Sequence, residues 1–391
     1  MVEPILYEYM REMLQQTTQQ HLRYLYNDIN WNARMIGIVG ARGVGKSTMV
    51  LQHIKKYHNP GKALYVAADN IYFNTHTLLS LADDFQKDGG ELLVIDEIHK
   101  YKQWSKELKT IYDVHPKLKI IFTGSSILDI KRGEADLSRR TLMYDMQGLS
   151  FREYLLIIHG IKSPVYSLDD IVNHRVELPG IEHPLPYFRK YLEHGYYPFC
   201  NEPGFFKRLD QVVQQTIDTD IAQYANIKPA TARRLKQLLG VISRLAPFKP
   251  SFDSLAQEVG VSKNNVPDYL VYLQQAGMID LLRDDTVGLR ALGKIEKVYI
   301  DNPSLMTVLA RNNPDLGNLR ETFFLSQMRV RNVVMASRES DFCIAPYTFE
   351  VGGKRKGKRQ IENVSNGIVV RDDIEFGGGI IIPLWHFGLN Y

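Results

Sequence analysis

The stretch "GARGVGKST", residues 40–48, decides how the first third of the chain folds. It fits the pattern G-x-x-x-x-G-K-[ST] and stands between "RMIGIVG", which is typical of a buried strand, and "KSTMVLQHIKKYH", which is typical of a helix. Glycines here let backbone N–H groups turn inward around a phosphate, and the N-terminus of the following helix adds partial positive charge. The stretch therefore predicts a nucleotide site on an α/β fold.

Two side chains of this stretch have chemistry of their own. Lys46 is expected to reach the β- and γ-phosphates of ATP, and Ser47 to supply its hydroxyl to Mg²⁺. The residues expected to surround the nucleotide are Gly40, Ala41, Arg42, Gly43, Val44, Gly45, Lys46, Ser47 and Thr48. ATP and Mg²⁺ are thus the predicted cofactors.

A second segment, "ELLVIDEIHK" at residues 91–100, supports the nucleotide site. Its apolar run predicts a buried strand that delivers two acids, Asp96 and Glu97, at its carboxyl end. Two buried acids are costly unless a cation lies beside them. We expect Asp96 to hold the magnesium shell and Glu97 to act as general base toward the attacking water.

Two further segments carry weaker signals. "LKIIFTGSS", residues 118–126, predicts a third strand that ends in hydroxyl side chains, with Ser125 able to orient water or the γ-phosphate; these hydroxyls could instead cap the next helix. Arg139 and Arg140 stand ahead of another predicted strand. One of them could neutralise transition-state charge across a subunit interface, although a surface arginine pair is usually only solvated.

The order of "GARGVGKST", "LLVIDEIHK", "IFTGSS", "LSRR" and "GLSFREYL" resembles the AAA+ ATPases of a prokaryotic family related to archaeal origin-recognition ATPases. The resemblance implies that Ser125 is the sensor-1 residue and that Arg140 is the arginine finger of a homo-oligomer, with Arg139 as the second candidate. His99 and Trp104 also occupy positions where this family has similar residues, and packing beside the Asp-Glu strand explains both.

The segment "SLAQEVGVSKNNVPDYLVYLQQAGMI", residues 254–279, predicts two short helices around a turn at Gly260, followed by a β-wing. Ser262 is expected to cap the second helix. Lys263, Asn264 and Asn265 at its start are suited to DNA phosphates or base edges. The alternative is a winged helix that serves packing or a protein partner without touching DNA.

The C-terminal region resembles the PD-(D/E)xK nucleases that are often joined to such ATPases. The resemblance assigns Glu321, Asp341 and Glu350 to the metal-binding acids, but Gly352 stands where the lysine is required. The stretch "TFEVGGKRKGKRQ", residues 348–360, is therefore interpreted as a degenerate nuclease strand that leads into a basic loop, Lys354–Arg359. Lys354 could replace the missing lysine, or the basic loop could bind nucleic-acid backbone or be a solvated turn.

Composition adds little to these motifs. The chain has 391 residues, 48 basic and 44 acidic, so any DNA contact must sit on a local patch rather than follow from net charge. Two cysteines, Cys200 and Cys343, predict neither a disulfide framework nor zinc. With no signal-peptide pattern and no apolar run long enough for a membrane span, we expect a cytoplasmic protein without membrane contact.

Residues 3–30 predict a helical segment with a stripe of Ile5, Leu6, Tyr9 and Met13.

The predicted fold is α/β: a P-loop AAA+ core with a parallel sheet, a helical lid, a winged helix and an α+β restriction-nuclease-like C-terminal domain. The predicted domains are an N-terminal helical segment (1–30), the AAA+ core (31–158), the lid (159–228), the winged helix (229–286) and the nuclease-like domain (287–391). Three functions remain open: a DNA-associated ATPase, a nucleotide switch acting on a protein partner, and an ATP-coupled nuclease, against which Gly352 argues.

Overall fold

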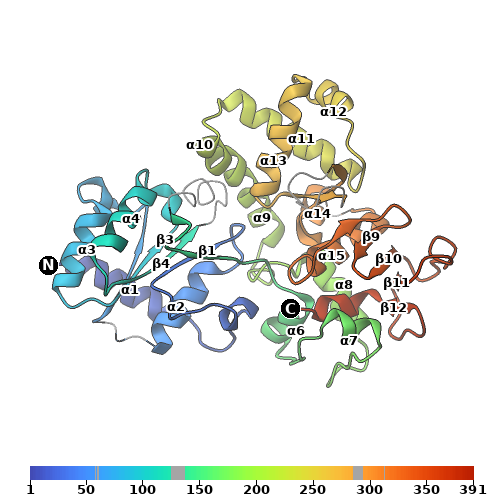
Figure 1. Cartoon of the computed structure of the whole chain (residues 1–391), viewed down its shortest axis with the longest axis horizontal. Coiled ribbons are helices and arrows are strands. Elements are labelled where there is room, and N and C mark those ends of the chain that lie inside the picture. Colours follow the sequence, from blue (N-terminus) through green and yellow to red (C-terminus); the bar gives the residue numbers. More distant parts are fainter. Residues whose placement is uncertain (58, 60, 125–136, 285–293, 312) are drawn as a thin grey trace. The chain divides into compact units, whose positions relative to one another are not determined.

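The computed structural model describes the chain except for residues 58, 60, 125–136, 285–293 and 312. The chain divides into two compact units, Met1–Gln147 and Gly148–Tyr391. Within the described residues, the first unit holds one five-stranded sheet. The second holds a two-stranded sheet and another five-stranded sheet (Figure 1).

The sheet of the first unit is parallel, with the strand order β2-β3-β4-β1-β5. Its strands are β1 (Met35–Val39), β2 (Ala63–Ala67), β3 (Leu92–Asp96), β4 (Lys119–Gly124) and β5 (Leu142–Asp145). Strands β1 to β4 are almost wholly buried, as expected when helices cover both faces of a parallel sheet. This order brings together the carboxyl ends of β1, β3 and β4, where ligands bind in such sheets.

Helices cover this sheet on both faces, with α3 and α4 on one side and α2 on the other (Figure 1). The helical elements are α1 (Pro4–Gln16), η1 (Tyr24–Asn27), α2 (Lys46–Tyr57), η2 (Ile71–Asn74), α3 (Leu78–Lys87), η3 (Ile98–Lys100) and α4 (Trp104–Val114). The core between sheet and helices includes Leu93 and Ile95 of β3, Leu81 and Phe85 of α3, and Leu108 of α4.

The N-terminal segment departs from its prediction in two ways. Its helix ends at Gln16 instead of continuing to about residue 30. Its buried face is formed by Leu6, Met10 and Leu14, spaced four residues apart, whereas Ile5 is 63% exposed. The predicted stripe was therefore wrong at Ile5, while Leu6 is buried and Tyr9 and Met13 are half-buried. Helix α1 packs along the edge strand β2 and belongs to the first unit.

The second unit begins with a run of helices. They are α6 (Phe151–His159), α7 (Leu168–Val172), α8 (Leu185–His194), α9 (Phe205–Gln215), the π-helical turn η4 (Thr216–Ile221) and α10 (Ala222–Tyr224). Helix α6 starts with a capping box between Ser150 and Glu153 and ends at Gly160, whose φ of 71° suits glycine. Helix α6 follows the division after Gln147 and therefore belongs to the second compact unit.

Three helices and an antiparallel strand pair follow. They are α11 (Pro229–Leu245), α12 (Phe252–Val259), the turn η5 (Lys263–Asn265), α13 (Val266–Gln275), β6 (Ile279–Arg283) and β7 (Ile295–Ile300). The two helices around Gly260 are confirmed. The Ser262 side chain makes no capping hydrogen bond, because η5 intervenes before α13. The predicted boundary at 286/287 cuts the β6–β7 pair, since β7 completes a hairpin with β6.

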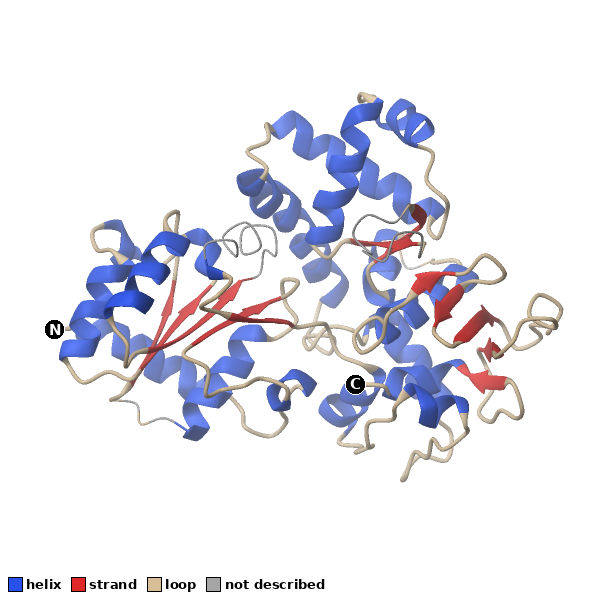
Figure 2. Cartoon of the chain, viewed as in Figure 1, coloured by secondary structure: helices blue, strands red, loops and turns tan. Residues whose placement is uncertain are grey.

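The remaining elements form a mixed sheet with helices packed on it (Figure 2). They are α14 (Pro303–Leu309), α15 (Leu316–Met328), β8 (Met335–Ala336), β9 (Phe342–Ile344), β10 (Tyr347–Gly352), β11 (Gly367–Arg371), β12 (Ile381–Pro383) and η7 (Leu384–Leu389). Strands β10, β11 and β12 run parallel, and β9 pairs antiparallel with β10. Phe323 and Phe324 of α15 and Phe349 of β10 are fully buried in this part of the core.

The last residue of the chain is anchored where the second unit begins. Tyr391 is fully buried, and its hydroxyl donates to the Gly148 carbonyl at 3.2 Å. Its main-chain oxygen accepts from Ser150 Oγ at 2.7 Å and from Arg152 Nε at 2.8 Å. The first and last segments of this unit therefore share one hydrogen-bonded cluster. In the described part of the chain, no helix has the length and apolar character to cross a membrane.

Candidate active site

The loop between β1 and α2 has the backbone that a phosphate site requires. Gly40, Gly43 and Gly45 have φ values of 155°, 85° and 99°, which side chains with a Cβ rarely adopt. At Gly40 a Cβ would also lie 2.2 Å from the carbonyl oxygen of Met146. Glycine is therefore required at Gly40 on both counts, and the loop leads directly into the N-terminus of α2.

Lys46 lies at the start of α2, as predicted, and is 6% exposed. Its Nζ donates to the carbonyls of Gly40 and Ala41, both at 2.9 Å, so the ammonium is held over the glycine loop. On the other side, the buried Arg23 donates to the carbonyls of Val44 and Gln147. Sequence reasoning missed Arg23, because it supports the loop from a segment without motif or periodicity.

Asp96 is surrounded by hydroxyl groups from three different elements. Ser47 Oγ lies 2.8 Å from Asp96 Oδ2, and the hydroxyl of Tyr65 on β2 lies 2.5 Å from the same oxygen. Thr123 of β4 donates its hydroxyl to Oδ1. Burial first, and then the charge of Asp96, raise the pKa of Tyr65, so this hydroxyl stays protonated and donates.

The donor set around Asp96 fits magnesium. A serine hydroxyl and a carboxylate lie within hydrogen-bond distance of each other, and hard oxygen ligands of this kind are those that Mg²⁺ takes beside phosphates. Ser47 and Asp96 are the two residues that the sequence assigned to the metal. Ser47 follows β1 and Asp96 ends β3, the two strands on either side of β4, and the fold brings the two side chains together.

Glu97 follows β3 in a left-handed backbone conformation, with φ 51° and ψ 43°, which is uncommon outside glycine. Its carboxylate lies 2.6 Å from Lys100 Nζ and 3.9 Å from a guanidinium nitrogen of Arg42. Lys100 also contacts Asp69 at 2.5 Å. Burial alone would lower the pKa of Lys100, but its hydrogen bonds to Asp69 and Glu97 outweigh burial and raise that pKa. Two basic side chains, Lys100 and Arg42, thus lie beside the Glu97 carboxylate at the end of β3.

His99 and Trp104 both pack behind the acids, as the sequence indicated. Trp104 is 7% exposed and lies against Phe122, with ring centroids 5.9 Å apart. His99 is 6% exposed, and neither ring nitrogen has a hydrogen-bond partner among the described residues. Burial lowers the pKa of His99 to about 4, so the ring is neutral near pH 7.

The remaining ATPase residues are less fully placed. Ser125 lies outside the described residues, so the sensor-1 prediction stays a prediction. The strand before it, β4, contributes Thr123, whose hydroxyl also accepts a hydrogen bond from the Glu97 N–H at 3.2 Å. Arg140 stands just before β5 and forms a two-point ion pair with Asp113 of α4, with both contacts at 3.0 Å. In this structure Arg140 is engaged within its own domain.

The residues predicted for DNA contact on the helical part are exposed at the start of α13. Lys263 Nζ lies 2.8 Å from Asp253, so its charge is matched within the same subdomain. Asn264 and Asn265 are exposed in the turn η5, but α13 itself carries an acid, Asp268, in its first turn. This surface offers little net positive charge to a phosphate backbone.

Two of the three predicted nuclease-like acids, Glu321 and Asp341, share one lysine. Lys297 of β7 places its Nζ 3.2 Å from Glu321 of α15 and 3.2 Å from Asp341. The hydroxyl of Tyr299 donates to Glu321 at 2.8 Å. Burial first, and then Asp341, raise the pKa of Glu321. Lys297 was missed because it lies on β7, outside the helix and strand from which the nuclease pattern takes its acids.

Glu350 is 1% exposed on β10 and pairs with Lys356. A Cβ added to Gly352 would meet the side-chain carbons of Lys356 at 2.5–2.8 Å, so Lys356 fills the space that residue 352 leaves. The suggested replacement by Lys354 was therefore wrong, since β10 ends at Gly352 and the chain turns before Lys356 folds back. Within the described residues, no group of three acids, histidines or cysteines could hold a metal ion.

The other four cations of the basic loop are exposed: Lys354, Arg355, Lys358 and Arg359. None of them forms an ion pair with another described residue, in contrast to Lys356. The main chain of the loop is fixed at its base, where Arg371 Nε donates to the Lys356 carbonyl at 2.9 Å and the Asp372 N–H donates to the Gly352 carbonyl at 2.9 Å. The loop thus presents unmatched positive charge on an ordered base.

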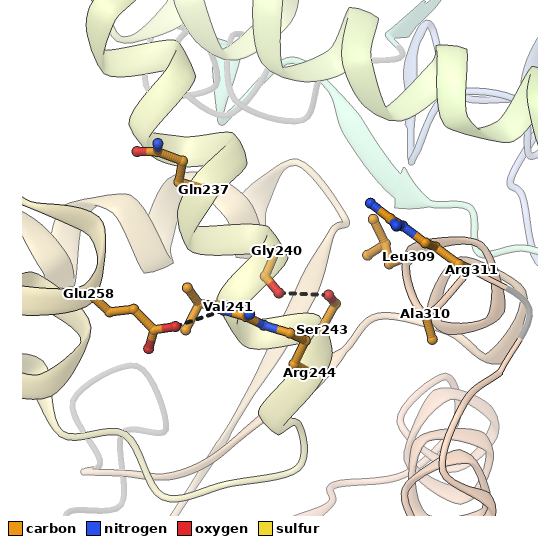
Figure 3. Close-up of a pocket in the computed structure, with 9 residues that line it drawn as sticks. All are labelled: Gln237, Gly240, Val241, Ser243, Arg244, Glu258, Leu309, Ala310 and Arg311. Carbon is orange, nitrogen blue, oxygen red and sulfur yellow. Dashed lines mark hydrogen bonds and ion pairs between the residues drawn. The ribbon is translucent and has the colours of Figure 1, made fainter.

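A cavity of about 620 Å³ lies between α11, α12 and the end of α14 (Figure 3). Arg244 and Glu258 on its wall neutralise each other at 2.7 Å, and Ser243 donates its hydroxyl to the Gly240 carbonyl at 2.9 Å. Most polar groups of the wall are thus satisfied internally. The cavity has no converging set of groups that would define a ligand.

Comparisons with known proteins agree with this geometry. Residues 32–155 match the family described as "AAA domain", and residues 185–316 match a domain of unknown function, DUF8612. The chain is 24% identical to the "Uncharacterized protein MJ1637" of Methanocaldococcus jannaschii, in an alignment that covers 93% of this chain and 85% of that protein.

Two solved structures align with this chain at low sequence identity and low TM-score. The Walker-type ATPase PABY2304 of Pyrococcus abyssi is 13% identical, with a TM-score of 0.44, over 79% of this chain and 96% of that chain. The Thermotoga maritima RuvB Holliday junction branch migration motor is 14% identical, with a TM-score of 0.28, over 70% of this chain and 89% of that chain. Likeness at this level does not transfer function. The comparisons therefore give two local similarities, residues 32–155 to the AAA domain family and residues 185–316 to a domain of unknown function.

Proposed function

We propose that the protein binds ATP with Mg²⁺ at the carboxyl edge of the first sheet and hydrolyses it to ADP and phosphate. The observation that carries this proposal is the convergence of Ser47, Thr123 and Asp96 beside a glycine loop whose lysine is buried. A phosphate site, a metal-binding pair of oxygen ligands and an acid for proton transfer occur at one edge of one sheet, which is more than a phosphate-binding turn requires.

Each residue has a defined part in this reaction. Lys46 and the N–H groups of the glycine loop hold the phosphates, with the N-terminus of α2 behind them. Glu97 accepts the proton of the water whose oxygen attacks the γ-phosphorus, while the bond from that phosphorus to the bridging oxygen breaks. Mg²⁺ held by Ser47 and Asp96 would neutralise charge on the β- and γ-phosphate oxygens. For this role the Glu97 carboxylate must exchange its contact with Lys100 for the water.

Two substitutions test the proposal. Lys46→Ala removes the buried ammonium over the loop and should abolish binding of a fluorescent ATP analogue. Glu97→Gln should preserve binding but lower ATP turnover at least about a hundredfold, the usual contribution of a positioned general base. Lys56→Ala, an exposed lysine on the same helix, is the matched control and should change neither property. Normal turnover by Glu97→Gln would show that the assigned role is wrong.

The second part of the proposal is that Arg140 completes the site of a neighbouring subunit in a homo-oligomer. Its place before β5 supports this role, and its ion pair with Asp113 means that the arginine must leave that acid on assembly. Ser125 keeps the proposed sensor-1 role on the strength of its position after β4.

The third part of the proposal is DNA association through the basic loop. Four exposed cations without acidic partners on an ordered base suit a phosphate backbone better than the α13 surface, where Asp253 neutralises Lys263. The three helices and strand pair at 229–300 fit a winged helix that serves packing more than DNA contact. We further propose that the nuclease-like acids are inactive, because Lys297 is paired with Glu321 and Asp341 and Lys356 is paired with Glu350.

DNA binding is tested by fluorescence anisotropy over a salt series. A variant with serine at the four exposed loop positions should bind DNA more weakly, irrespective of base sequence. The slope of the logarithm of its binding constant against the logarithm of the salt concentration should flatten by close to one unit for each phosphate that the loop no longer neutralises. A control variant removes the same charge from the first unit by replacing Lys102, Lys106, Lys109 and Lys117 with serine. Equal affinity of the loop variant and the unmodified protein would favour the alternative, a nucleotide switch that acts on a protein partner.

A further inference from the structure

Tyr65 is a residue of the ATPase unit that no motif includes, yet it contacts the most important carboxylate. It lies in the middle of β2, is 1% exposed, and donates its hydroxyl to Asp96 Oδ2 at 2.5 Å. Ser47 reaches that same oxygen from the other side at 2.8 Å. One carboxylate oxygen is thus fixed between the metal-binding serine and a buried tyrosine.

Strand register explains how a residue on an edge strand reaches this position. Strands β2 and β3 are parallel neighbours, with Ala67 opposite Asp96, so Tyr65 lies two residues before the level of Asp96. Two residues of a strand span about 6.6 Å, close to the length of a tyrosine side chain from Cα to its hydroxyl. Leu64 and Val66 belong to the core on the opposite face, so Tyr65 is left facing the side of the sheet where the glycine loop lies.

The ring of Tyr65 is itself supported by the N-terminal helix. Tyr9 of α1 stacks on it, with ring centroids 6.3 Å apart and planes inclined by 23°. Helix α1 packs along β2, so a continuous path of contacts runs from Tyr9 through Tyr65 to Asp96. A tyrosine fixed by stacking holds its hydroxyl in one direction, which a mobile ring would not do.

We propose that Tyr65 is a positioning residue for Asp96, and that Tyr9 of the N-terminal helix keeps Tyr65 in place. The role is to fix the orientation of the carboxylate that receives magnesium, in the manner of hydrogen-bond partners behind metal ligands in other proteins. The inference rests on the proposed Mg²⁺–ATP site and adds to it a dependence on α1, a helix that precedes the motifs.

The test measures equilibrium binding of a fluorescent ATP analogue by anisotropy, first in EDTA and then over a Mg²⁺ titration. Tyr65→Phe keeps the ring and removes only the hydroxyl. We expect its affinity in EDTA to be unchanged and its Mg²⁺ midpoint to rise about tenfold, the lower end of the effect of removing such a partner. Tyr9→Leu should shift the midpoint in the same direction, by about threefold, because it removes the stacking interaction alone.

Tyr7→Phe is the matched control, since it removes a hydroxyl from the same helix near Asp88 and not Asp96, and it should leave the midpoint unchanged. A normal Mg²⁺ midpoint in Tyr65→Phe overturns the inference, as does an equal loss of affinity with and without Mg²⁺. If Tyr65→Phe does not fold, Tyr9→Leu tests the inference instead, through its affinity for the ATP analogue in EDTA and its Mg²⁺ midpoint. Failure of the proposed function looks different, because the unmodified protein itself would then show no nucleotide binding or no response to Mg²⁺.

Discussion

Replacement of Lys297 by methionine should destabilise the second unit by about 3 kcal/mol. Its Nζ lies 3.2 Å from Glu321 Oε2 and 3.2 Å from Asp341 Oδ1. At an effective dielectric constant of about 20, each contact is worth roughly 5 kcal/mol before the desolvation of the ammonium is subtracted. Removing one partner of a buried pair typically costs about 3–5 kcal/mol. We take the lower end because the Lys297 side chain is 31% exposed.

The physical reason is the pair of acids that the substitution leaves behind. Glu321 already has a raised pKa through burial and through Asp341, and without Lys297 the two carboxylates repel each other with no cation between them. Lys297→Met combined with Glu321→Gln removes one positive and one negative charge and should recover at least about half of the loss. Glu321→Gln retains an oxygen that can accept from Tyr299.

Urea unfolding followed by tryptophan fluorescence measures the effect. The chain has three tryptophans, and Trp385 is the one in the second unit, so Trp31→Phe with Trp104→Phe makes the signal specific for that unit. Lys294→Met is the control: it lies just before the same strand and is 68% exposed, so its effect should stay within about 0.5 kcal/mol. A cost below about 1 kcal/mol for Lys297→Met, or a double variant no more stable than the single one, would refute the reasoning.

The ATPase unit and the C-terminal acids give three more expected outcomes. Mixing Arg140→Ala with Glu97→Gln protein should restore part of the ATP turnover, because a mixed interface pairs an intact acid with an intact arginine; no recovery in a verified mixed assembly would contradict the role in trans. The pKa of His99 in the folded state is about 4, below its ordinary 6.5, so the unfolded chain binds the extra proton as the pH falls. The free energy of unfolding of the first unit should therefore fall by about 2 kcal/mol between about pH 7.5 and 5. Urea titrations of His99→Gln should show no such fall. Incubation with Mg²⁺ or Mn²⁺ should give no cleavage of plasmid or linear DNA, and nicking that disappears in Glu350→Ala would show an active nuclease.

The sequence predicted the parts of the ATPase site that are local in the chain. The glycine loop, Lys46, Ser47 and Asp96 follow from fixed spacing between a strand and a helix, and the parallel sheet then brings the acids and the loop to one edge. Tyr65 and Arg23 could not be predicted in this way, because each acts on a partner 31 or 21 residues away through the tertiary fold. Hydrophobic periodicity describes which face of a strand is buried and not what its side chain touches.

The C-terminal region shows the same limit more sharply. The sequence assigned Glu321, Asp341 and Glu350 to one site, and the structure links Glu321 and Asp341 through Lys297, while Glu350 pairs with Lys356. The cations that accompany them were not, since Lys297 comes from a hairpin that the predicted boundary divided, and Lys356 folds back over Gly352 from a loop. A missing side chain in a strand leaves a space, and the sequence alone does not say which neighbour fills it.

The anchoring of Tyr391 gives the second unit a mechanical property. The hydrogen bonds of Tyr391 to Gly148, Ser150 and Arg152 close this unit into a loop at the point where the connection from residue 147 enters it. Tension applied through that connection is shared at once between α6 and the segment that follows η7. The helices α11, α12 and α13, between residues 229 and 275, take no part in the three Tyr391 hydrogen bonds that bear this tension first.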